Sequence, residues 1–231
     1  MSGSETYLSF IQSQLRPAEK TPQPVELKRS VTISRQSGCG AHAVARALAQ
    51  YLQEHSPVAA APWTVFDRDL MEKVLADHNL PERLAQFMPE DAISGIKDAM
   101  EELFGVRPAA WTLVEQTAET ILRLASLGNV IILGRGANII TAKLPGTLHV
   151  RLVGSLNRRI AAVQEYEGLS HAVAADRIRA EDLGRQRYLR KYFDRDIDDP
   201  LLYHLVINTD LLPPQTSARL IGDAVLSRQS P

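Results

Sequence analysis

The residues best suited to chemistry lie in a glycine-containing segment, residues 34–42, between a β-branched run and an alanine-rich stretch. Small residues let the backbone curl so that several N–H groups point inward, and a following helix adds its positive N-terminal end. Together these features form an anion site suited to phosphate. We therefore predict a loop that holds a phosphorylated ligand, most simply a nucleotide, through Ser37, Gly38, Cys39, Gly40, Ala41 and His42.

This loop departs from the GxxxxGK[ST] pattern of phosphate loops. When the two are aligned on Gly40, Arg35 stands in place of the first glycine. Ala41 stands in place of the lysine that contacts the terminal phosphates, and His42 in place of the hydroxyl residue. Arg35 is the cation available to replace that lysine. The alternatives are a tight strand-to-helix turn with no ligand and, for Cys39, a small filling side chain or a reactive thiol.

The elements that position the loop follow from the hydrophobic pattern. Apolar and β-branched runs predict strands at residues 27–34, 63–66, 129–133, 147–153 and 203–208. Apolar residues at helical spacing predict helices at 41–55, 70–77, 111–127, 155–167, 170–192 and 217–228, with short helices between 80 and 104. Because strands and helices alternate, we expect an α/β fold in which helices cover both faces of a three-layer parallel sheet.

The helix predicted at residues 155–167 illustrates the local reasoning. Ser155 precedes its first apolar residue and is expected to act as the N-cap. Leu156, Ile160 and Val163 then fall on one face, which we expect to turn toward the core.

The chain divides into a small appendage and a main domain. Residues 1–26 are polar and contain three prolines, and Leu8, Ile11 and Leu15 form the apolar side of a short amphipathic helix. This helix is expected either to dock on the domain itself or to make a homodimer contact. Residues 27–231 form the domain.

Composition limits the partners and the compartment. The 231 residues carry a formal net charge of −1, so no overall positive field attracts nucleic acid or an anionic membrane, and neither partner is expected. The single cysteine excludes an intrachain disulfide and fits a reducing compartment. Neither a secretory signal nor an apolar run approaching the ~20 residues of a membrane span is present, so we expect a cytoplasmic protein.

Three further segments follow the loop in a set order. They are residues 66–70 (FDRDL) and 132–137 (ILGRGA), each after a predicted strand, and 182–188 (DLGRQRY), whose helix leads to the strand sequence 203–209 (YHLVINT). With ISRQSGCG in front of them, the chain resembles the cytidylate kinase-like family, a divergent branch of the phosphate-loop nucleoside monophosphate kinases. The resemblance extends over residues 31–226.

The resemblance implies a phosphate-loop core, an insertion at residues 67–104 that helps to close over an acceptor nucleotide, and a helical lid at residues 155–199. It implies ATP and Mg²⁺ as cofactors and a nucleoside monophosphate or related small phosphorylated acceptor as substrate. Arg135, between two glycines, matches the acceptor-binding arginine of the family, and Asp67 is placed to contact the acceptor. Asp67 also suits a helix N-cap, and no metal ligand is assigned.

The predicted lid is rich in arginine, and cations on a mobile lid suit phosphoryl transfer, which relies on positioning and charge neutralisation. Asp182, Arg185 and Tyr188 recur at a spacing of three and lie near one helix face. The alternative is a solvated, salt-bridged helix. The spacing of Asp182, Arg185 and Tyr188 resembles a signature of the family, and Arg159 matches another family arginine. We expect catalytic roles for Arg35, Arg179 and Arg185, and further lid contacts from Arg159, Asp182, Arg187 and Tyr188.

Two other functions compete with an ATP-dependent phosphotransferase. A nucleotide sensor without catalytic activity would account for the departures at Ala41, His42 and Gly136. A dinucleotide-binding oxidoreductase is suggested by Gly38-x-Gly40, but it leaves the arginine-rich helix unexplained.

Overall fold

A computed structural model describes residues 28–56, 61–67, 96, 98–101, 103–104 and 112–228. Within these residues five strands form a single sheet in the order β2-β3-β1-β4-β5, and every neighbouring pair is parallel. The strands are β1 (Ser30–Arg35), β2 (Thr64–Phe66), β3 (Val130–Leu133), β4 (Thr147–Val153) and β5 (Leu205–Asn208). The predicted α/β class with a parallel sheet is confirmed.

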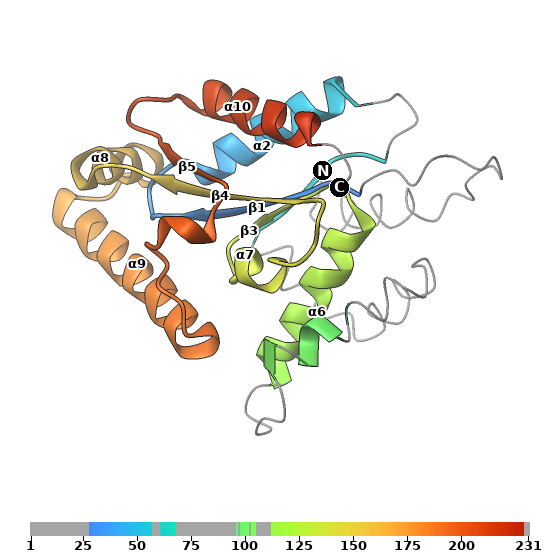
Figure 1. Cartoon of the computed structure of the whole chain (residues 1–231). Helices are drawn as coiled ribbons and strands as arrows, with labels where there is room; N and C mark the ends of the chain where they lie inside the picture. The colour runs from blue at the N-terminus through green and yellow to red at the C-terminus, as the bar shows by residue number, and fades with distance from the viewer. Residues whose placement is uncertain are drawn as a thin grey trace.

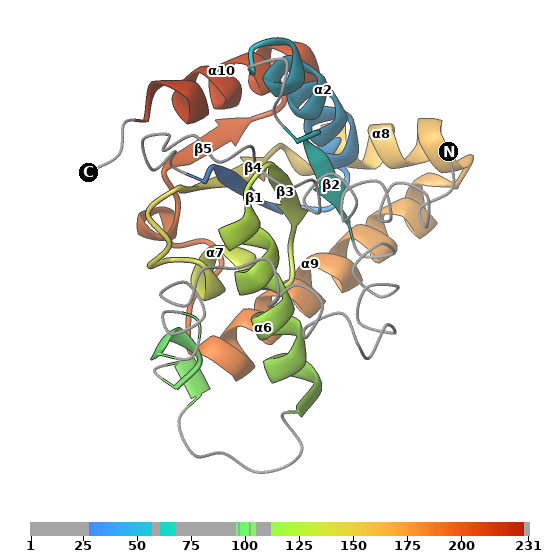
Figure 2. The same ribbon diagram turned by 90° about the vertical axis from the view of Figure 1, so that its right-hand side faces the viewer.

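Helices cover both faces of this sheet. The helical elements are α2 (Ala41–Glu54), α6 (Thr112–Leu127), α7 (Ala137–Ile140), α8 (Leu156–Glu167), α9 (His171–Phe193), the 3-10 turn η2 (Pro200–Leu202) and α10 (Pro214–Ser227). Helices α2 and α10 lie together on one face, and α6 and α7 lie on the other (Figure 1). The perpendicular view shows the same three layers (Figure 2).

The two faces of the sheet differ in polarity. Toward α2 and α10, β1 and β4 present buried aliphatic side chains, including Ile33 and Val150. Their opposite face carries three buried cross-strand hydrogen bonds that follow the strand register: Ser30 to Thr147 (2.8 Å), Thr32 to His149 (2.9 Å) and Ser34 to Arg151 (2.9 Å). This polar ladder ends at the carboxyl end of the sheet, where Arg151 is placed.

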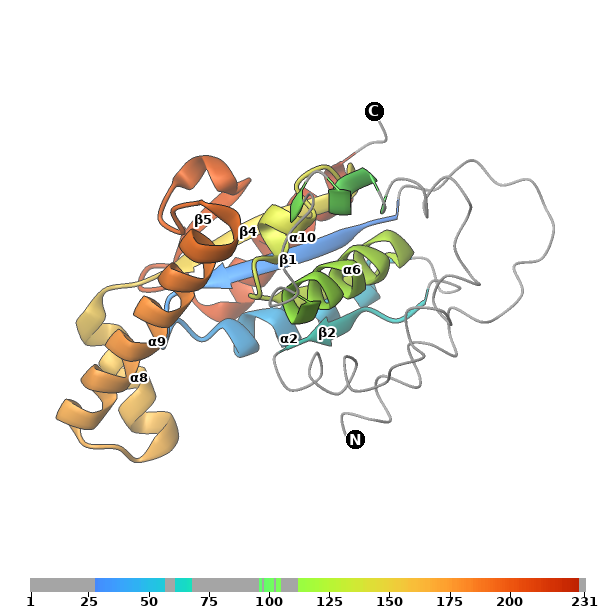
Figure 3. The same cartoon turned by 90° about the horizontal axis from the view of Figure 1, so that it is seen from below.

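Helices α8 and α9 lie side by side at the end of the sheet (Figure 3). They share a small apolar cluster that is separate from the two cores against the sheet and contains Ile160, Val163, Ala174, Ala175 and Ile178. Farther along α9, Leu189 is buried, and Phe193 packs against the core under α6. The first half of α9 therefore packs against α8, and its end packs against the core under α6.

Three local predictions are wrong. Ser155 precedes α8, but its hydroxyl makes no cap hydrogen bond; its N–H donates instead to the Asp210 carboxylate (2.9 Å). Leu156 is 37% exposed rather than buried, because it lies beside a cavity described below. The last strand begins at Leu205 rather than at residue 203, and residues 203–204 connect η2 to it. The short helix α7 was not predicted.

Other predictions lie outside the described residues. These are the amphipathic helix and homodimer contact of residues 1–26, the helix at 70–77 and most of the insertion up to residue 104. In the part of the chain that the structure describes, every helix is too short or too polar to cross a membrane.

Candidate functional site

The predicted phosphate loop joins β1 to α2 and packs tightly against α8. Gly38 has a φ of 82°, and a Cβ there would lie 2.7 Å from the Arg159 carbonyl oxygen. Glycine is therefore required at this position by both conformation and space. Cys39 and Ala41 are buried, and Gly40 is the N-cap of α2. The strand, glycine turn and helix thus form the predicted arrangement.

Carboxylates of α9 contact this loop directly. The Ser37 N–H donates to Asp182 Oδ1 (2.6 Å), and the Ser37 hydroxyl donates to Glu181 Oε2 (2.6 Å). Arg159 donates through the same Nη1 to the Ser37 carbonyl (3.0 Å) and to Asp182 Oδ2 (2.6 Å). The loop therefore binds anionic groups, here two side chains that lie about 145 residues away in the sequence.

Arg185 completes this ionic cluster. Its guanidinium donates to Glu181 Oε2 (2.8 Å) and to Asp182 Oδ1 (3.1 Å). Burial opposes ionisation of Glu181, but hydrogen bonds from Ser37, Arg185 and Arg177 outweigh it and lower its pKa to about 2. Glu181 is thus a carboxylate at neutral pH. The predicted proximity of Asp182 and Arg185 is confirmed, and Glu181 is a site residue that the sequence reasoning missed.

Arg35 lines the site between the charges of Arg185, Glu181, Arg135 and Asp67. Burial lowers the pKa of its guanidinium to about 10, and the positive charges of Arg185 and Arg135 add to this effect, while Glu181 and Asp67 oppose it. Within the described residues, the guanidinium makes no hydrogen bond or ion pair. Buried charges in proteins are normally paired, so an unpaired, partly buried arginine is suited to hold an external anion.

The predicted acceptor residues lie at the same edge of the sheet. Asp67 follows β2, and its carboxylate is 3.8 Å from the imidazole of His42 at the start of α2. Arg135 follows β3 with a φ of 58° and is close enough to Arg35 to lower the pKa of that guanidinium. Asp67, Arg135 and Arg35, which lie at the ends of three different strands, therefore come close to one another.

Tyr188 lies close enough to Arg135 for that charge to act on its hydroxyl. It belongs to an aromatic cluster at the end of α9, with ring centroids 5.0 Å from Tyr192 and 6.0 Å from Phe193. The Phe193 ring packs directly on Gly136, the residue after Arg135. Burial raises the pKa of the Tyr188 hydroxyl. Tyr188 therefore anchors α9 next to the Arg135 turn.

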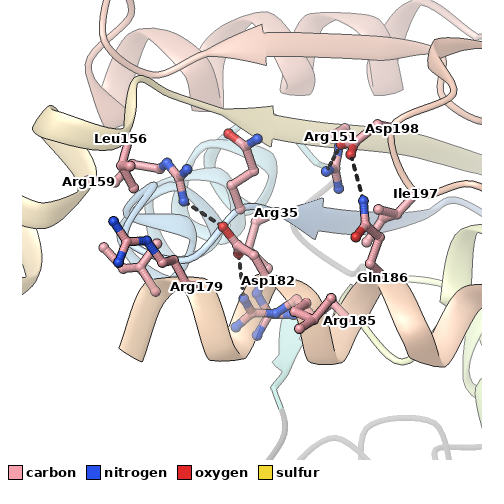
Figure 4. Close-up of a pocket in the computed structure, with 13 residues that line it drawn as sticks. Arg35, Arg151, Leu156, Arg159, Arg179, Asp182, Arg185, Gln186, Ile197 and Asp198 are labelled. Carbon is pink, nitrogen blue, oxygen red and sulfur yellow. Dashed lines mark hydrogen bonds and ion pairs between the residues drawn. The ribbon is translucent and has the colours of Figure 1, made fainter. Parts of the chain in front are cut away.

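A cavity of about 390 Å³ opens between the loop, β4, α8 and α9 (Figure 4). This volume lies within the range of small-ligand sites. Arginines dominate its charged lining, namely Arg35, Arg151, Arg159, Arg179 and Arg185, against the two carboxylates of Asp182 and Asp198. A cavity with this excess of guanidinium groups is suited to a multiply charged anion.

Arg151 was not predicted as a site residue. It is 4% exposed on β4, and it donates to Ser34 Oγ (2.9 Å) and to the Asp198 carboxylate (2.5 Å). The available signal was a charged residue in the otherwise apolar end of the strand sequence TLHVRLV. A cation in a buried parallel strand needs a partner, and the carboxyl end of such a strand is where ligands bind.

Three predicted residues are less central than expected. Arg179 lines the cavity, but it is largely exposed and pairs with Asp176 on its own helix (3.3 Å). Arg187 is exposed on α9 and is absent from the cavity lining. Burial raises the pKa of the Cys39 thiol, which favours a filling role over a reactive one.

Among the described residues, no group of three or more His, Cys, Asp or Glu side chains could hold a metal ion. Mg²⁺ commonly needs only one or two carboxylates in addition to substrate phosphates. Asp67 faces the charge cluster and fits such a minimal role.

The parallel sheet, with helices on both faces and a glycine turn between β1 and α2, defines an α/β protein. Sequence comparison gives the family: a profile of the cytidylate kinase-like family matches residues 30–211. The chain therefore belongs to the cytidylate kinase-like family.

Comparison with solved structures finds similarity at low sequence identity. An uncharacterised protein from Eubacterium ventriosum is 19% identical, with a TM-score of 0.58 over 87% of this chain and 100% of its own. Shikimate kinase from Bacteroides thetaiotaomicron is 14% identical, with a TM-score of 0.43 over 87% of this chain and 99% of its own.

One curated protein shares part of the sequence. A protein from Corynebacterium glutamicum named uronate isomerase is 33% identical over 97 residues, which are 42% of this chain. The match spans 18% of the length of that protein.

Proposed function

We propose that the protein is a phosphotransferase that moves the γ-phosphoryl group of ATP, with Mg²⁺, to a nucleoside monophosphate or a related small acceptor. Membership of a kinase-like family supports the class of reaction. The observation that carries the proposal is the unpaired guanidinium of Arg35, set between the phosphate loop, Arg135 and Arg185. In phosphoryl transfer the protein mainly positions the reactants and neutralises charge, and a converging set of cations supplies both.

The residues divide between the two substrates by position. The loop amides at residues 37–42 and the N-terminal end of α2 would hold the donor phosphates. Arg35 would take the place of the missing lysine at the transferred group, with Arg185 and Arg159 on its lid side. Asp67 and Arg135 would hold the acceptor. During transfer, the bond from the γ-phosphorus to the bridging oxygen breaks, a bond to an acceptor oxygen forms, and ADP leaves.

Mg²⁺ would offset phosphate charge during this transfer. Asp67 is the carboxylate on the acceptor side that could support it. Glu181 and Asp182 are already hydrogen-bonded to Ser37 and to arginines.

A coupled assay tests the proposal. ADP formation from ATP should depend on an added acceptor, in a panel of nucleoside monophosphates and small phosphorylated compounds. The Arg35→Gln variant should lose at least about 100-fold in turnover, the usual effect of removing a strong transition-state contact. Arg190→Gln is the matched control, because Arg190 is an exposed arginine on α9 that pairs with Asp194, and this variant should retain the rate. ATP binding without turnover for any acceptor would reject the proposal.

A nucleotide sensor is the second candidate, and a specific contact favours it. Asp182 already uses the Ser37 N–H, and Ala41 removes the lysine that normally contacts the terminal phosphates. A sensor of this kind would bind ATP and change the position of α9 without transferring phosphate. It predicts a thermal shift with ATP in the absence of turnover.

A further inference from the structure

The contact between α9 and the phosphate loop uses groups that a polyphosphate would also need. The Ser37 N–H has a single proton, and it points at Asp182 Oδ1. The Ser37 hydroxyl and the Arg185 guanidinium point at Glu181. A phosphate oxygen that accepts from the same amide must replace the carboxylate, because one N–H makes one strong hydrogen bond.

Charge makes this exchange necessary. Glu181, with its lowered pKa, is ionised at neutral pH, and Asp182 is held by two arginines. Two carboxylates within hydrogen-bonding distance of one loop residue would repel a polyphosphate in the same loop. The section of α9 that carries them must therefore move away from Ser37 when the loop binds phosphate.

Helix α9 is built to allow this movement. Its first half packs on α8 through Ala174, Ala175 and Ile178, in a cluster separate from the two main cores. Near its end Leu189 is buried, and Phe193 packs against the core under α6. If the α8–α9 pair rotated relative to the sheet, α9 would have to bend between these two halves.

Gly184 lies between these two halves of α9, and between Asp182 and Arg185 in the sequence. A Cβ at Gly184 would meet nothing within 4 Å, and its φ is not positive, so neither space nor backbone conformation requires glycine. Glycine inside a helix weakens it locally, and glycine is a common site of helix bending. Here it directly follows the carboxylates that must leave the loop.

We propose that Glu181 and Asp182 are an internal competitor for the polyphosphate, and that α9 bends at Gly184 to release them from Ser37. The inference rests on the proposed function, because it concerns the same loop. It deepens that function by making nucleotide affinity depend on the position of the lid helix. The carboxylates then hold Arg159 and Arg185 in position while the loop is without phosphate.

Isothermal titration of the full chain with ATP and with inorganic tripolyphosphate, without Mg²⁺, tests this proposal. Glu181→Gln keeps an acceptor for the Ser37 hydroxyl and removes the charge, so affinity should rise about fivefold or more. Gly184→Ala stiffens the helix without a clash, so affinity should fall about threefold to fivefold. Val173→Ala, at an exposed position in the first half of α9, also favours helix and should leave affinity unchanged.

Hydrogen exchange of the loop gives a second readout. The peptide that contains Ser37 should exchange faster in Glu181→Gln and more slowly in Gly184→Ala than in the unaltered chain. The competitor proposal would be overturned, and the proposed function left intact, by one set of results. In that set the unaltered protein binds ATP, the ATP affinity of Glu181→Gln is unchanged or weaker, and the ATP affinity of Gly184→Ala is unchanged. Absence of binding in the unaltered chain and all variants would overturn both.

Discussion

The guanidinium of Arg35 occupies the space above Gly134 that a side chain at that position would fill. The two residues end neighbouring parallel strands, β1 and β3, and Gly134 has a φ of 80°. The absence of a side chain at Gly134, directly after β3, therefore leaves room for the Arg35 guanidinium. The position of Arg35 depends on a residue about 100 positions away in the sequence.

Gly134→Ala should separate these two residues. The added Cβ displaces the Arg35 guanidinium, so ATP affinity and turnover should fall at least about tenfold. Gly168→Ala is the control, because Gly168 also has a positive φ of 68° but faces open space. Both variants should lose about 1 kcal/mol of stability from backbone strain. Equal activity in the two variants would show that the Arg35 position does not matter for function.

Arg35→Gln should make the protein more stable and less active. The lowered pKa of Arg35 means that the folded state disfavours its charged form, so the charge costs stability at every pH below about 10. Removing it should raise the free energy of unfolding by about 1–2 kcal/mol. Thermal denaturation checks this gain, and the stabilisation by ATP should disappear. A loss of stability in the variant would contradict the unpaired state of Arg35.

The packing of the loop on α8 is testable at Gly38. A Cβ there would lie 2.7 Å from the Arg159 carbonyl and 3.0 Å from its Cβ, so α8 must shift. We expect Gly38→Ala to cost about 2–4 kcal/mol in urea denaturation. Gly40→Ala shares the positive φ but meets nothing within 4 Å, so it should cost only about 1 kcal/mol. Similar costs for both variants would argue against a tight contact between the loop and α8.

The polar ladder between β1 and β4 predicts acid sensitivity. Burial lowers the pKa of His149 to about 3, and the neighbouring His204 and Arg228 add to the effect, while Thr32 Oγ1 is its hydrogen-bond partner. Between pH 6.5 and 3 the unfolded chain binds a proton here that the folded chain does not.

The contribution of His149 to the free energy of unfolding should therefore fall as the pH decreases through this window, by up to about 1.4 kcal/mol per pH unit. His149→Asn should flatten this dependence in denaturant titrations, and the two slopes should coincide above pH 7.5. An unchanged slope below pH 6 would show that His149 is protonated in the folded protein.

The fold was accessible from the sequence because local patterns determined it. The loop at residues 34–42 sits between a β-branched run and an alanine-rich helix, and β3 is a continuous apolar run whose four residues are all buried. The pairing of Asp182 with Arg185 also follows from spacing along one helix. Each of these inferences uses only neighbouring residues.

The remaining site features depend on contacts between distant segments. The docking of Glu181 and Asp182 on Ser37 depends on how α9 crosses the sheet end, and the Ser34–Arg151 contact depends on the register of β1 and β4. Leu156 was misassigned because helical periodicity identifies an apolar face but cannot distinguish a core from a cavity wall. Sequence order alone carries none of this information.

The most direct measurement is ATP turnover of the unaltered protein and of Arg35→Gln, with and without a panel of nucleoside monophosphates. Detection of both ADP and the phosphorylated acceptor distinguishes transfer from hydrolysis. We predict equal amounts of the two products, formed only when an acceptor is present, and a loss of at least about 100-fold in Arg35→Gln. Transfer that persists undiminished in Arg35→Gln, or ATP binding that yields no phosphorylated acceptor, would contradict the central role given to Arg35.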